Sequence, residues 1–102
     1  MPLKVYIRNG HNVVYEAVLR NSYEPMAKEA GIRDILWNPP NNAIDLVLPL
    51  RNGLETMKKY PAKFKSMNEP EGWVNVDHFT SWVKDYLDSC VKYPLGTVSV
   101  SV

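Results

Sequence analysis

The sequence predicts an α+β fold in which a small antiparallel sheet of about three strands packs against three to four helices. Apolar and polar residues alternate near both ends of the chain, in residues 3–8 and 97–102. Alternation with a period of two is typical of a strand with one buried face. The middle of the chain instead carries apolar side chains at helical spacing. The economical arrangement is one sheet that holds both ends under the intervening helices, in the order β-β-α-α-α-β.

Length and composition indicate a single domain, 1–102. A chain of 102 residues can bury one core without a metal or a disulfide. The formal net charge of +1 makes nucleic acid an unlikely partner, because domains that hold a phosphate backbone carry a strong basic excess. The chain begins without an apolar leader and has no run long enough to span a membrane. We therefore expect a cytoplasmic protein with no membrane association.

A hairpin is predicted at the start of the chain. Asn9-Gly10 is the strongest short signal for a two-residue turn, because both residue types tolerate a positive φ. It separates residues 3–8 from residues 13–19, which are rich in β-branched and aromatic side chains. We predict that these two segments pair antiparallel. A helix over residues 13–20 is the alternative, since several of its side chains are compatible with a helix.

A short helix is predicted next, over residues 26–30. Pro25 suits its first turn, and Gly31 suits the position just after its end. Residues 37–42 follow as a rigid loop, because they contain two adjacent prolines and three asparagines.

A longer helix should begin near Asn42 and run to about Tyr60. Pro49 lies inside it and is expected to kink it or split it into two pieces. Pro61 then opens a further turn or two. The apolar side chains that recur at three and four residues, and so predict one buried face, are Ala43, Val47, Leu50, Leu54 and Met57.

The last helix is predicted from about Asn75 to about Tyr93, where Pro94 and Gly96 end it before the strand over residues 97–102. Its expected buried face consists of Val76, Phe79, Val83, Tyr86, Leu87 and Cys90.

Two tryptophans adjoin loops that contain proline or glycine, and they are the strongest candidates for a binding surface. An aromatic side chain on a rigid loop offers a flat contact with little rotamer entropy to lose. We predict that Trp37 and Trp73 line a common concavity with Asn38, and that Asn21 and Tyr23 contribute hydrogen bonds. The alternative is that both indoles fold down onto the helices, since large aromatics are mostly buried.

The sequence contains two histidines and one cysteine that are candidates for catalytic or ligand-binding roles. His11 adjoins the predicted turn among several asparagines, where it could orient a polar ligand or act as a base; an exposed hairpin tip is the alternative. His78 follows Asp77 in the first turn of the last helix, but adjacent helical residues diverge by about 100° and make a poor metal pair. Cys90 has no base one turn away and is expected to be a buried structural residue. We expect no metal and no cofactor.

A basic and aromatic segment precedes the second loop. Such mixtures are typical of proteins that bind single-stranded nucleic acid, but the near-neutral chain favours a solvated helix face. The residues concerned are Lys58, Lys59, Tyr60, Lys63, Phe64 and Lys65.

A set of separated short motifs covers most of the chain beyond residue 16: Met26-Ala27…Glu29-Ala30-Gly31-Ile32, Leu36-Trp37-Asn38-Pro39, Gly72-Trp73 and Phe79…Cys90…Pro94. Together they resemble a family of small uncharacterised bacteriophage and prokaryotic proteins. The resemblance implies no activity and no functional residue. In that family a polar stretch with histidine precedes the Met-Ala helix. Here Asn21-Ser22-Tyr23 holds that place without a histidine, which disfavours a catalytic histidine there.

These observations favour a small binding protein, encoded by a phage or mobile element, that acts by stoichiometric contact with a host defence protein or a small polar signalling molecule. Two alternatives remain open. One is a small enzyme acting on a polar or nucleotide-like substrate, with His11 or His78 as base. The other is a structural homo-oligomer. We expect a homodimer, because residues 97–102 form a strand without charge, proline or glycine to protect its edge.

Overall fold

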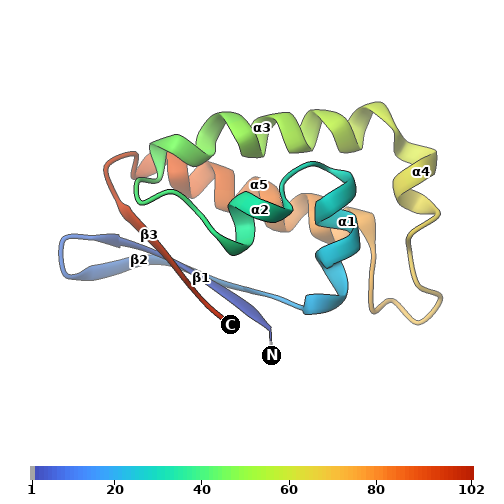
Figure 1. Ribbon diagram of the computed structural model, residues 1–102, viewed down its shortest axis with the longest axis horizontal. Helices are drawn as coiled ribbons and strands as arrows, with labels where there is room; N and C mark the ends of the chain where they lie inside the picture. Colours follow the sequence, from blue (N-terminus) through green and yellow to red (C-terminus); the bar gives the residue numbers. More distant parts are fainter. Residues whose placement is uncertain (1) are drawn as a thin grey trace.

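The computed structural model describes residues 2–102 and confirms the α+β fold, with all the helices on one side of an antiparallel sheet (Figure 1). Within these residues the sheet has three strands in the order β2-β1-β3, so the first strand is the central one. The strands are β1 (Leu3–Asn9), β2 (Asn12–Leu19) and β3 (Thr97–Ser101).

Five α-helices and one 3₁₀ turn separate β2 from β3 in the described part of the chain. The longest two, α3 and α5, pack side by side above the sheet (Figure 1). No helix within residues 2–102 is long and apolar enough to cross a membrane. The elements are η1 (Asn21–Tyr23), α1 (Glu24–Glu29), α2 (Arg33–Trp37), α3 (Ile44–Lys59), α4 (Pro61–Lys65) and α5 (Val76–Lys92).

The predicted hairpin is confirmed. Gly10 has a φ of +66°, the left-handed conformation that a tight turn requires. Residues 3–9 pair antiparallel with residues 12–19, so the alternative helix over residues 13–20 is excluded.

Both edges of the sheet are partly covered by other segments. On the β3 side, Val98 N–H donates to the carbonyl of Asn41 at 2.8 Å, and Ala43 N–H donates to the carbonyl of Gly96 at 3.0 Å. On the β2 side, the indole Nε1–H of Trp82 donates to the carbonyl of Val18 at 3.0 Å. Such covering is how natural sheets avoid pairing with other chains. The covering on the β3 side reaches only the start of this strand, so the C-terminal half of β3 remains an uncovered edge.

The predicted apolar face of α5 is confirmed, since all six of its residues are buried. The face of α3 is rotated slightly from the prediction: Leu46 and Gly53 are buried, whereas Val47 and Leu54 are only half-buried. Gly53 explains the difference, because a Cβ there would lie 2.5 Å from Cγ2 of Ile32. Because Ile32 packs against Gly53, the side of α3 that carries Gly53 faces the core.

One of the two outcomes expected at Pro49, a kink or a split, is excluded, and one helix was not expected. The split at Pro49 does not occur, because α3 continues through it as one helix. A proline removes one backbone hydrogen bond, and the fully buried Leu46 and Leu50 on either side fix both halves of the helix in the core. The helix α2 was not predicted, because five residues are too few for a helical period to be visible.

Candidate functional site

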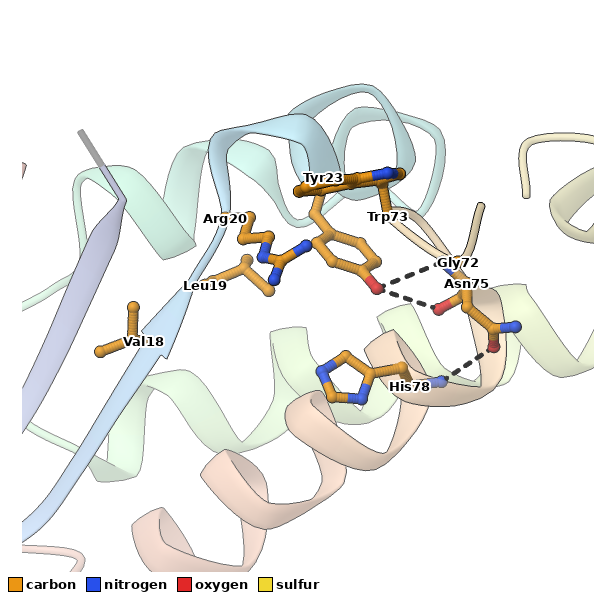
Figure 2. A pocket seen from close by; sticks show the side chains of 8 residues that line it. All are labelled: Val18, Leu19, Arg20, Tyr23, Gly72, Trp73, Asn75 and His78. Carbon is orange, nitrogen blue, oxygen red and sulfur yellow. Dashed lines mark hydrogen bonds between the residues drawn. The ribbon is translucent and has the colours of Figure 1, made fainter. Parts of the chain in front are cut away.

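A pocket of about 500 Å³ opens between the end of β2 and the start of α5 (Figure 2) and is called here the Tyr23 pocket. Its walls come from the end of β2, from η1, from the loop before α5 and from the first turn of α5. The lining residues are Val18, Leu19, Arg20, Tyr23, Gly72, Trp73, Asn75 and His78.

Tyr23 fixes the inner wall of this pocket. Its side chain is only 3% exposed, and its ring stacks on that of Phe79 with 5.4 Å between centroids. Its hydroxyl accepts a hydrogen bond from Asn75 N–H at 3.1 Å and lies 3.5 Å from the Asn75 carbonyl, to which it donates (Figure 2). The 3₁₀ turn is thereby joined to the start of α5.

Asn75 also caps α5. Its Oδ1 accepts from the backbone N–H groups of Asp77 at 2.9 Å and His78 at 3.2 Å. This occupies amides that a helix start otherwise leaves without a partner. The cap orients the first turn so that the exposed His78 ring extends toward the pocket, 6.1 Å from the ring of Tyr23 (Figure 2). Because the cap occupies these two amides, the guanidinium of Arg20 is the main group in the lining that can hold a ligand's negative charge.

Arg20 and Trp73 form the outer wall. The guanidinium carbon of Arg20 lies 4.9 Å from the centre of the Trp73 ring, a cation–π contact. Trp73 is 52% exposed, and its Nε1–H donates to a carboxylate oxygen of Glu71 at 2.9 Å. Within residues 2–102 Arg20 forms no ion pair, so its fork of N–H donors is available to an anion.

Two of the six predicted site residues, Tyr23 and Trp73, meet in this pocket. Asn21 precedes Tyr23 in η1 but lines a separate hollow with the start of α1. His11 is exposed at the hairpin tip, as the alternative interpretation has it.

The structure does not bring the two tryptophans together in the pocket. Trp37 ends α2, where it is half-buried and the guanidinium carbon of Arg33 lies 5.4 Å from its ring centre. Asn38 follows it as an exposed residue, and neither residue lines the Tyr23 pocket. The Tyr23 pocket is therefore not the predicted concavity shared by Trp37, Asn38 and Trp73. Trp37 packs partly against the core, which is the alternative given for it.

Sequence reasoning did not select Arg20 or Asn75 for the site, and it named His78 only as a base of the alternative enzyme. Asn75 carried a signal, because asparagine before a helix is a strong N-cap. Arg20 carried none, since an arginine after a strand is ordinary. The hydrogen bond between Tyr23 and Asn75 spans 52 residues, which no local pattern indicates.

A second group of titratable side chains is buried away from the pocket. Cys90 is fully buried, as predicted, and burial raises the pKa of its thiol to about 12. Burial is also the main cause that raises the pKa of Tyr15 to about 12 and raises that of Tyr86 further. The Tyr86 hydroxyl is buried without a hydrogen-bond partner in the described part of the molecule. A thiol with so high a pKa is a poor nucleophile.

Residues 2–102 contain no group of three or more His, Cys, Asp or Glu side chains arranged to hold a metal ion. The polar lining of the Tyr23 pocket comes instead from Arg20, Tyr23, Asn75 and His78. Comparisons with protein-family models, with curated proteins and with solved structures find no match to this chain.

Proposed function

We propose that the protein binds one small anionic molecule in the Tyr23 pocket and acts by holding it. The observation that carries this proposal is the Arg20 guanidinium, which stacks on Trp73, has no carboxylate partner within residues 2–102 and lines the pocket together with His78. The planar guanidinium matches a carboxylate or a phosphate with two parallel hydrogen bonds. Of the two kinds of partner that the sequence suggested, the pocket favours the small polar molecule.

The remaining features of the pocket suit such a ligand. Its volume of about 500 Å³ lies in the usual range for small-molecule sites. The half-exposed indole of Trp73 offers an apolar surface for the body of the ligand. Tyr23 and Asn75 hold the walls in place, so little order has to be gained on binding.

Arg20→Ala is expected to weaken binding of an aromatic anion by more than tenfold. Phenyl phosphate and phenylacetate are suitable probes, because each joins a ring to one of the two anions. Isothermal titration calorimetry measures both affinities. Arg51→Ala is the matched control, since it removes the same charge from an exposed position on α3 and should leave both affinities unchanged. Equal losses in the two variants, or no loss with Arg20→Ala, would contradict the proposal.

The proposal includes a homodimer joined along the open half of β3. In an antiparallel sheet, alternate residues direct both backbone groups to the same side. Val98 directs its N–H outward to Asn41, so Val100 also directs its N–H and C=O away from β1. Within residues 2–102 no hydrogen bond reaches these groups of Val100. The β3 strand of a second copy of the chain, running antiparallel, can pair with these backbone groups. Neither strand carries a charged side chain that would disfavour the pairing.

Val100→Pro is expected to shift the dimer toward the monomer. Proline removes the outward N–H but no hydrogen bond to β1, and edge positions of this kind tolerate it. Ser99→Pro is the control, because it removes an inward donor and should lower thermal stability instead. Sedimentation equilibrium measures the mass of each. A wild-type protein with the mass of one chain at high micromolar concentration would end this part of the proposal.

A further inference from the structure

A second hollow, of about 460 Å³, lies between α3, α4 and α5. It shares no lining residue with the Tyr23 pocket, although both adjoin the start of α5. It is called here the lysine groove, and its lining residues are Leu54, Glu55, Met57, Lys58, Pro61, Lys65, Val76, Asp77, Thr80 and Lys84.

The floor of the lysine groove is apolar. Met57 and Val76 are 4% and 8% exposed, and Leu54 is half-buried beside them. Thr80 contributes little polarity, because its hydroxyl donates to the Val76 carbonyl of its own helix at 2.7 Å. The floor therefore favours a hydrocarbon over a hydrogen-bonding group.

The rim of the lysine groove carries one lysine from each of the three helices, Lys58, Lys65 and Lys84. Within residues 2–102 none of them forms an ion pair, whereas Lys63 on the outer side of α4 pairs with Glu29. Two carboxylates, Glu55 and Asp77, also line the groove, so the lysines leave an excess of one positive charge. Lysine stems add further apolar surface below their ammonium groups.

We propose that the lysine groove binds a medium-chain fatty carboxylate. The hydrocarbon chain lies on Leu54, Met57 and Val76, and the carboxylate meets the rim lysines. The excess of one positive charge matches a monoanion. The volume of about 460 Å³ lies in the usual range for a site that holds one small molecule. This site is separate from the proposed function and stands without it.

A series of probes tests the two halves of the proposal in the wild-type protein. Affinities for hexanoate, octanoate and decanoate, measured by titration calorimetry below micelle formation, should rise by about fourfold for each added methylene. Decyltrimethylammonium has the same chain with the opposite charge and should bind more than tenfold more weakly than decanoate. Amide shifts in ¹⁵N NMR should localise decanoate to α3, α4 and α5. Equal binding of the two decyl probes, or no dependence on chain length, overturns the proposal.

Two variants that each lose three positive charges test whether decanoate binds in the lysine groove. The triple change Lys58→Gln, Lys65→Gln and Lys84→Gln should weaken decanoate binding by more than tenfold. The control changes three exposed lysines elsewhere to glutamine: Lys4, Lys28 and Lys92. Arg20→Ala should leave decanoate binding unchanged, which separates this site from the Tyr23 pocket. Equal losses in both triple variants overturn the proposal, and so does an acidic helical peptide that binds the groove where decanoate does not.

Discussion

Raising the pH from about 8 to about 11 is expected to lower the free energy of unfolding on the order of 4 kcal/mol. The cause is the group of core acids formed by Tyr15, Tyr86 and Cys90. Burial disfavours their charged forms and raises the pKa of each in the folded protein, to about 12 for Cys90 and Tyr15.

The direction follows from the protons that each state holds. In the unfolded chain the thiol has a pKa near 9.0 and the tyrosines have a pKa near 10.0, so they ionise first. The folded protein keeps these protons to higher pH. Stability is therefore complete below about pH 9 and falls as pH rises, by about 1.4 kcal/mol per pH unit for each group involved. Tyr15 is half-buried and should contribute less than the other two.

Guanidinium denaturation at pH 8, 9, 10 and 11 measures this loss. Cys90→Ala is the informative variant, because between about pH 9 and 10 the thiol contributes most of the slope. Its profile should be flatter than the wild-type profile from about pH 9 up to pH 11, because the folded protein keeps the thiol proton to about pH 12. Above about pH 10 the two tyrosines add the same further slope to both proteins. A wild-type stability that stays constant to pH 11 would contradict the assignment of these groups to a dry core.

Replacing tyrosine by phenylalanine is expected to have opposite effects at Tyr23 and Tyr86. At Tyr23 the change removes a hydroxyl that accepts from Asn75 N–H and leaves this donor without its partner. A loss of about 1–3 kcal/mol is expected. At Tyr86 the change removes a buried hydroxyl that has no hydrogen-bond partner among residues 2–102, so the stability should stay the same or rise by about 1 kcal/mol.

The two variants control for one another, because each loses one oxygen and keeps its ring. Thermal and guanidinium unfolding give the two free energies, and the Tyr23→Phe protein should also bind phenyl phosphate more weakly, since its pocket wall is loosened. Equal destabilisation by both changes would show that the hydroxyl of Tyr86 has a partner after all.

The parts of the fold that the sequence predicts well depend on neighbouring residues. Asn9-Gly10 determines the hairpin because turn geometry is local, and the six apolar residues of α5 repeat over about four turns. The rotated face of α3 was harder to predict, because it depends on the close packing of Gly53 against Ile32, the residue that precedes α2. A glycine in a helix does not indicate which partner approaches it.

The candidate site was predicted less well for the same physical reason. Tyr23 and Trp73 could be selected by their type, since exposed or hydrogen-bonded aromatics favour binding. The pocket itself could not be predicted, because Arg20 and His78 come to line one cavity only after Tyr23 is joined to Asn75 across 52 residues. Trp37 also adjoins a loop that contains proline, yet it ends α2 and packs partly against the core.

The central place of β1 has a consequence for synthesis on the ribosome. One side of β1 pairs at once with β2, but its other side pairs with β3, about 90 residues later in the chain. At roughly 5–20 residues per second, this side stays unpaired for on the order of 5–20 seconds. Throughout that time the nascent chain carries an apolar hairpin with an open inner edge. A chaperone that shields such edges during translation should therefore raise the yield of native protein more than one added after release.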